Sequence, residues 1–261
     1  MPDVDPHVLR HDEGGVATLT LNRPARRNAL SLAMLEALDD ALSQVDADRS
    51  VRAVVLAGAG PAFCAGHDLR ELTGSDDPHL AERTFAWCSE VMVRITRLRQ
   101  PVIAAVQGIA TAAGCQLVAT CDLAVAAESA RFATPGVDIG LFCTTPMVAL
   151  TRAVAPKHAM ELLLTGEAIS AHEAHRIGLV NRVVADDELT ASVGELAAVI
   201  AAKPADVVAA GKAARAAQSG LGLADAYALA SAEMVAGLAR PHAAEGIGAF
   251  LEKRPPRWEQ G

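Results

Sequence analysis

Two short segments, each an apolar run followed by a turn of small residues, constrain the fold more than any other part of the sequence. They are Phe63–Leu69, FCAGHDL, and Pro101–Leu117, PVIAAVQGIATAAGCQL. Each pattern predicts a buried strand that enters a Gly/Ala-rich turn at the start of a helix. Such a turn lets a ligand approach the main chain and leaves the first N–H groups of the helix unpaired. Two such turns facing each other would hold one developing oxyanion between two amides.

Short apolar runs alternate with amphipathic stretches in the rest of the chain. The runs predict strands at Val16–Leu21, Val51–Ala57, Val102–Val106, Leu123–Ala127, Arg131–Ala133 and Leu179–Val184. With helices between them, this order indicates an α/β body wound as a spiral of β-β-α turns rather than a doubly wound sheet. Ala-rich helices follow at Leu189–Ala202, Ala205–Gln218, Leu223–Leu238 and His242–Leu251. We expect a body over residues 1–187 and a helical region over residues 188–261 that packs on the body or on a neighbouring subunit.

The composition argues against several classes of function. The chain has a net charge of -8 and 3% aromatic residues, whereas nucleic-acid binding needs basic patches and stacking platforms. No apolar run has membrane-spanning length without a charge or a breaker, and the polar N-terminus lacks the apolar core of a signal peptide. Five cysteines without a CxxC pair are typical of free thiols in a reducing compartment. We therefore expect a cytoplasmic protein with no nucleic-acid or membrane partner.

Three further patterns fail to match known catalytic or cofactor motifs. Gly58–Phe63, GAGPAF, lacks the third glycine of a dinucleotide-binding loop. His172 and His175 do not have the HExxH spacing of a zinc site, so no metal is expected. The chain also lacks the GxSxG elbow of a serine hydrolase.

In this order, five motifs and the C-terminal segment make the chain similar to the crotonase (enoyl-CoA hydratase/isomerase) superfamily over essentially its full length. These segments are Asn22–Leu30, Ala62–Leu69, Pro101–Leu117, Cys121–Ala126, Phe132–Leu141 and Gly246–Trp258. The resemblance implies a spiral α/β body and C-terminal helices that mediate trimerisation, commonly into a dimer of trimers. It also implies an acyl-CoA thioester as substrate, with no separate cofactor because coenzyme A is part of that substrate.

In the family, two backbone N–H groups polarise the thioester carbonyl and hold its enolate. Carried over by motif, these are the amides of His67, after Ala65 and Gly66, and of Ala113, just before Gly114. The two positions fall in the Gly/Ala-rich turns of Phe63–Leu69 and Pro101–Leu117.

The chain departs from the family at the two positions where hydratases carry glutamates. The helix after the second turn has Gln116, and the position after the proline of the FxxPE-like loop has Gly136. An amide neither accepts nor donates a proton usefully at neutral pH, and glycine has no side chain. General acid–base help contributes about 10²–10⁴-fold for one group, so efficient hydration is not expected. ATAAGCQLVA and FATPGVDIGLFC also resemble one subgroup of the family that lacks both glutamates.

Other side chains are candidates for proton transfer. The His67 imidazole titrates near neutrality, although its ring would point into the structure if only its N–H is used. Asp138 would serve as base or nucleophile if it reaches the acyl group, or it simply caps a loop. Cys143 and Thr144 stand where some relatives carry a second carboxylate, and packing is the simpler role for both.

Substrate contacts are expected at the turns, at the basic loop near Arg26 and at the C-terminus. The expected contact residues are Arg26, Ala65, Gly66, Asp68, Leu69, Gly136, Phe250 and Lys253. Arg26 and its neighbours Arg23 and Arg27 would pair with the phosphates of coenzyme A, or they are simply solvated at the surface. Lys253 resembles a family cation near the adenine end, supplied by a neighbouring subunit in one interpretation. Asp68 would fix the first turn through local hydrogen bonds.

Two hypotheses of different classes follow. The first is an enzyme that binds an acyl-CoA and stabilises its enolate, with His67 and Asp138 as candidates for the proton transfer. The second is a catalytically silent acyl-CoA-binding or assembly protein of fatty-acid metabolism. Two oxyanion amides without either glutamate favour the second, and turnover of any acyl-CoA would favour the first.

Overall fold

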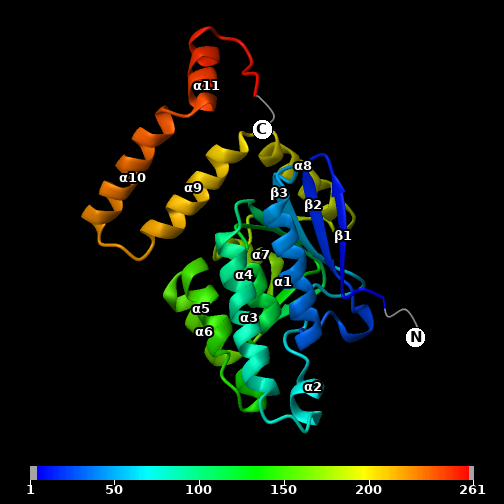
Figure 1. Cartoon of the computed structure of the whole chain (residues 1–261). Helices are drawn as coiled ribbons and strands as arrows, with labels where there is room; N and C mark the ends of the chain where they lie inside the picture. The colour runs from blue at the N-terminus through cyan, green and yellow to red at the C-terminus, as the bar shows by residue number, and fades with distance from the viewer. Residues whose placement is uncertain (1–4, 259–261) are drawn as a thin grey trace.

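Two sheets form the body in the computed structural model, which describes residues 5–258 (Figure 1). The larger sheet has the strand order β1-β2-β3-β4-β6-β9, and the smaller has the order β5-β7-β8. The strands are β1 Val8–Glu13, β2 Val16–Leu21, β3 Ala53–Gly58, β4 Val102–Val106, β5 Ile109–Thr111, β6 Leu123–Ala127, β7 Arg131–Ala133, β8 Ile169–Ser170 and β9 Arg182–Val184. The larger sheet is parallel except for β1, which is antiparallel to β2.

The chain winds as a spiral because consecutive strands enter different sheets. β4 lies in the larger sheet, β5 follows it in the smaller one, and helix α4 then closes the turn. β6 and β7 repeat the same step. This confirms the predicted β-β-α spiral. The sequence did not predict β1, β5 and β8: β1 is a largely exposed edge strand without apolar alternation, and β5 and β8 have only three and two residues.

Helices cover both faces of the larger sheet, so its central strands are apolar on both sides. The helices of the body are α1 Leu32–Ala47, α2 Leu69–Gly74, α3 Leu80–Arg97, α4 Ala113–Thr120, α5 Thr144–Ala153, α6 Pro156–Thr165, α7 Ala171–Arg176 and α8 Leu189–Ala201, with 3-10 turns at Pro24–Arg26, Pro135–Ile139 and Asp186–Glu188. The main core lies between α1, α3, α4 and one face of the sheet. On the other face, Leu189 and Val193 of α8 pack with Ile103 and Val125. The first helix of the predicted C-terminal region therefore completes the core of the body.

The remaining helices extend away from this body. They are α9 Ala205–Gln218, α10 Leu223–Leu238 and α11 Pro241–Leu251. Figure 1 shows α9 and α10 as a pair that projects from the body, with α11 beyond them. No residue of α9 or α10 is buried. Lys212 anchors α9 because its Nζ donates to the carbonyls of Ile95 and Gln100 and to the Asp122 carboxylate, at 3.0, 2.9 and 2.6 Å.

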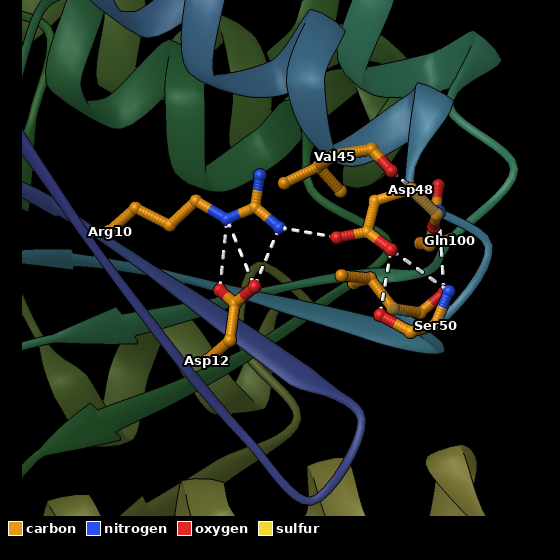
Figure 2. A network of polar contacts seen from close by, with 7 residues as sticks. Arg10, Asp12, Val45, Asp48, Ser50 and Gln100 are labelled. Atoms are coloured by element: carbon orange, nitrogen blue, oxygen red, sulfur yellow. Dashed lines mark hydrogen bonds and ion pairs between the residues drawn. The ribbon is translucent and has the colours of Figure 1, made fainter.

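A polar network ties the edge strand to the end of α1 (Figure 2). Arg10 of β1 donates to both Asp12 and Asp48, and Asp48 also accepts from the amide and the hydroxyl of Ser50. The Ser50 and Arg10 hydrogen bonds lower the pKa of Asp48 below its usual value. Gln100 donates to the carbonyl of Val45 at 2.9 Å, which joins the loop before β4 to the same corner.

All five cysteines are free, as the sequence predicts. Burial raises the pKa values of Cys64, Cys88 and Cys115 to about 12, so these thiols are unreactive at neutral pH. No helix within residues 5–258 is long and apolar enough to span a membrane.

Candidate functional site

The two Gly/Ala-rich turns lie against each other. Cys64 forms a parallel bridge with Ala110: its amide donates to Ile109 O at 3.1 Å, and its carbonyl accepts from Thr111 N at 3.0 Å. The contact is tight at Gly114, where a Cβ atom would lie 2.1 Å from the Cys64 carbonyl oxygen. Only glycine fits there without moving the main chain.

Gly66 brings the first turn close to the N-terminus of α4. Its φ of +89° is a left-handed conformation that favours glycine. A Cβ atom on Gly66 would lie 3.0 Å from Ala112 Cβ and 3.5 Å from the amide nitrogen of Ala113. Ala112 itself has a φ of +49°, which is strained for a residue with a side chain. The turn before α4 therefore holds a costly conformation at the point where the two segments meet.

The main-chain amides of His67 and Ala113 have no acceptor within residues 5–258. Leu30 donates to Gly66 O at 2.8 Å and accepts from Asp68 N at 3.1 Å. His67 lies between these two bonds, so its own N–H points away from Leu30. Ala113 is the first residue of α4, where an N–H has no partner in the helix. Two free donors thus belong to turns that are in contact.

Asn28 fixes the first turn from a distance, and sequence reasoning missed this role. Its buried side-chain amide donates to the carbonyls of Ala59, Ala62 and Phe63 at 2.9, 2.8 and 3.2 Å. Its Oδ1 accepts from the amide of Arg23 at 2.9 Å. The only hint of this role in the sequence is that an asparagine follows several arginines in a loop. Asparagine tolerates a left-handed backbone conformation, and Asn28 has a φ of +54°.

Asp68 follows the first turn directly, and its carboxylate makes two local contacts. It caps α2 by accepting from Glu71 N at 3.4 Å, and it pairs with Arg23 at 3.2 Å. This is the local role that the sequence predicts for Asp68. The Arg23 side chain is therefore paired within the protein, whereas Arg26 on the same loop is exposed. Leu69 is exposed at the start of α2.

The His67 ring is enclosed and neutral. It packs edge-on against Phe85 of α3, with ring centroids 4.9 Å apart and an interplanar angle of 79°. Both ring nitrogens are buried, and neither makes a hydrogen bond of good geometry in the described part of the chain, although the Leu30 backbone lies close enough to act on the ring. Burial lowers the pKa of His67 below its usual 6.5. The neutral ring can therefore still both donate and accept a hydrogen bond.

Gln116 and Gly136, the two positions at which the family resemblance predicts that glutamates are replaced, differ in their surroundings. Gln116 lies one helical turn after Ala113, is 4% exposed, and has an Oε1 atom without a partner among residues 5–258. At Gly136 a Cβ atom would lie 2.6 Å from Leu141 O and 2.9 Å from Cys143 Sγ. The loop around Gly136 therefore leaves no space for any side chain at that position. Burial raises the pKa of the neighbouring Cys143 thiol, which makes it a poor nucleophile.

Two predicted site residues lie far from the turns in this chain, and a third faces another element. Asp138 is exposed, and its carboxylate faces Gly166 at the end of α6, where a Cβ atom would lie 2.9 Å from Oδ2. Phe250 is 81% exposed, and Lys253 is also exposed. Figure 1 shows α11 at the opposite end of the molecule from α2, which starts just after the first turn. Roles for these residues at the turns stay predictions.

Comparisons with known proteins agree with the motifs. A family model described as Enoyl-CoA hydratase/isomerase matches residues 11–261. The mitochondrial enoyl-CoA hydratase domain-containing protein 3 of Rattus norvegicus is 46% identical, over 98% of this chain and 86% of its own length. A putative enoyl-CoA hydratase of Thermus thermophilus is 39% identical over 96% of this chain and 100% of its own.

Solved structures agree closely in fold. An enoyl-CoA hydratase structure from Mycobacterium smegmatis has 53% identity and a TM-score of 0.94, covering 97% of this chain and 99% of that one. Human enoyl-CoA hydratase domain-containing protein 3 has 45% identity and the same TM-score, covering 97% and 100%. The resemblance to one subgroup is thereby confirmed.

The predicted cytoplasmic location is wrong. It rested on a polar N-terminus and on free cysteines, whereas relatives from rat, mouse, frog, human and zebrafish are all named mitochondrial. Free thiols are compatible with more than one compartment, so cysteine usage could not decide the location.

Proposed function

The chain belongs to the enoyl-CoA hydratase/isomerase family, and from that premise we propose that it binds an acyl-CoA thioester and stabilises its enolate between two main-chain amides. The donors are the N–H groups of His67 and Ala113. The observation that carries this proposal is that both amides are free while their turns are in contact at Gly66. A single donor of this kind contributes about 3–4 kcal/mol to lowering a barrier.

Hydration is a poor fit to the side chains around these amides. By the family resemblance, Gln116 and Gly136 stand where hydratases use carboxylates, and neither residue transfers protons. The missing general acid–base help is about 10²–10⁴-fold for each group. We therefore assign the chain enolate stabilisation, with a reaction other than efficient hydration following it.

His67 is the first candidate for moving a proton in that reaction. Its ring belongs to the residue whose amide would hold the oxyanion, and both its nitrogens are buried beside that amide's turn. Asp138 is the second candidate, although its exposed carboxylate faces the end of α6. The alternative function is a silent acyl-CoA-binding or assembly protein, favoured by the same pair of free amides without either of the carboxylates that family hydratases use.

The C-terminal helices are proposed to assemble three copies, or two sets of three. Large apolar side chains stand exposed along α10 and α11: Leu223, Tyr227, Met234, Val235, Leu238, Phe250 and Leu251. Exposed apolar surface of this extent is typical of an interface. In such an assembly, Phe250 and Lys253 would contact coenzyme A bound to a neighbouring subunit, and Arg26 would pair with its phosphates.

A crotonyl-CoA hydration assay, run beside calorimetric titrations with crotonyl-CoA and a longer enoyl-CoA, tests the proposal. Binding of both ligands with little or no hydration is the expected result. Rapid hydration would mean that groups other than Gln116 and Gly136 supply the protons. If no coenzyme A thioester binds, the proposal is wrong.

A further inference from the structure

A cavity of about 620 Å³ lies where α9 meets the body. Its lining residues come from α3, α4, α5 and α9, from the start of β6, and from the segment between α7 and β9. Among the described residues of this lining, Gln116 alone has a role in the proposed function, and neither His67 nor Ala113 is one of them. A cavity of this size is typical of a site for a small organic molecule.

The lining of this cavity carries more positive than negative charge. Its charged side chains are Asp122, Arg152, Lys212 and Arg215, so the lining has a net charge of +2 in a chain whose own net charge is -8. The Asp122 carboxylate is already paired, because Lys212 donates to it at 2.6 Å and the amide of Val102 donates to it at 2.8 Å. The excess positive charge therefore belongs to the two arginines.

Neither arginine has a carboxylate partner among residues 5–258. The Arg215 guanidinium makes no hydrogen bond or ion pair there, and that of Arg152 donates only to the carbonyl of Val148, at 2.7 Å. Arg152 belongs to α5 and Arg215 to α9, so the two cations reach the same cavity from different elements. A guanidinium is always charged, and its planar fork of donors matches the oxygens of carboxylates and phosphates. The cavity is therefore suited to a negatively charged ligand.

Part of the cavity wall is apolar. Met92 and Val93 of α3, Val148 and Ala149 of α5, and Leu179 contribute side chains to it. Covering apolar surface with an apolar group is favourable, whereas a bare inorganic ion covers little of it. The wall and the arginines together indicate an anion that carries an apolar group.

We propose that this cavity binds a phosphate monoester of an apolar alcohol, with Arg152 and Arg215 holding the phosphate group. A phosphate monoester carries about 1.5 to 2 negative charges at pH 7, which matches the net charge of the lining better than a single carboxylate does. The apolar part of the ester would lie against the wall that includes Val148 and Leu179. This inference does not depend on the proposed function, because the ligand contacts neither of the two amides.

Calorimetric titration of the full chain with 1-naphthyl phosphate tests this inference, beside 1-naphthol, 1-naphthoate and inorganic phosphate. Naphthol lacks the charge, naphthoate has a single negative charge, and inorganic phosphate lacks the apolar group. We expect naphthyl phosphate to bind at least about tenfold more tightly than each of the other three. Its binding should also weaken at high salt, because exposed charges are screened.

Arg152→Gln and Arg215→Gln should each weaken the binding of naphthyl phosphate about tenfold and leave that of naphthol unchanged. Arg49→Gln is the matched control: Arg49 is exposed like the other two arginines, does not line the cavity, and should leave every affinity unchanged. Because all three side chains are exposed, these substitutions are expected to preserve the fold, which the urea unfolding midpoint of each variant checks.

The inference is overturned if naphthyl phosphate does not bind, if it binds no more tightly than naphthol or inorganic phosphate, or if the three arginine substitutions have equal effects. Displacement of naphthyl phosphate by butyryl-CoA would also overturn it, since both ligands would then share one site. If butyryl-CoA fails to bind while naphthyl phosphate binds as expected, the proposed function fails and this inference stands.

Discussion

At the scale of single residues, the site depends on glycines that allow two segments of main chain to touch. Gly114 is the sharpest case, because a methyl group there would overlap the Cys64 carbonyl at 2.1 Å. Gly194, on α8, has open space where its Cβ would be. The two glycines therefore form a matched pair for the same substitution.

Gly114→Ala is expected to destabilise the protein by about 1–3 kcal/mol, since main chain has to move to admit the methyl group. Gly194→Ala is expected to stabilise it by up to about 1 kcal/mol through helix propensity. Chemical denaturation of both variants measures the difference. Equal stability of the two variants would contradict the contact drawn between the turns.

His67 makes stability depend on pH in a direction set by its burial. Because burial lowers its folded pKa below the unfolded value of 6.5, the unfolded chain binds the extra proton first. The neutral ring's contribution to the free energy of unfolding is fully present above about pH 6.5. It is lost as the pH falls from the unfolded pKa toward the lower folded pKa. His67→Gln should therefore lose less stability between pH 7.5 and 5.5 than the wild type, as measured by urea unfolding. An identical loss in both proteins would show that the ring is not enclosed.

The sequence could reveal the turns but not how they are held. Small residues after an apolar run are a local pattern, so the segments ending at Leu69 and Leu117 were recognisable. Asn28 was not, because its three acceptors are carbonyls 31 to 35 residues away along the chain. A main-chain carbonyl carries no sequence signal, so a clamp of this kind becomes visible only in the folded chain.

At the scale of elements, α8 and α9 show why composition alone could not place the C-terminal helices. Both are Ala-rich, yet α8 completes the core of the body while α9 contributes no buried residue. The difference lies in Leu189 and Val193, whose partners are on β4 and β6. α9 is attached instead through the hydrogen bonds of Lys212.

Lys212→Met should loosen α9 while preserving the body. The substitution leaves the Asp122 carboxylate without its ion-pair partner and two carbonyls without this donor, at a cost of about 1–3 kcal/mol. Faster hydrogen exchange confined to α9 and the end of α3 is the expected readout. Lys203→Met, at an exposed lysine just after α8, is the control and should not change exchange. Unchanged exchange in Lys212→Met would mean that other contacts hold α9.

At the scale of the whole molecule, the proposed assembly rests on the exposed apolar side chains of α10 and α11. A charge placed on such a face costs far more in an interface than on a free surface. Tyr227→Asp and Leu238→Asp should therefore shift the sedimentation of the protein from a trimer or hexamer toward a monomer. Val199→Asp, on the exposed side of α8, should not. A wild-type chain that sediments as a monomer at micromolar concentration would contradict the proposed assembly.

Two main-chain amides are proposed to polarise the carbonyl of a bound thioester. The most direct measurement is the carbon NMR shift of octanoyl-CoA labelled with ¹³C at its carbonyl, recorded free and bound to the wild-type protein. Two donors on one oxygen draw electron density from the carbon, so a downfield shift on binding is predicted, reduced in Gly114→Ala. A bound thioester whose carbonyl resonance matches that of the free ligand would contradict the account.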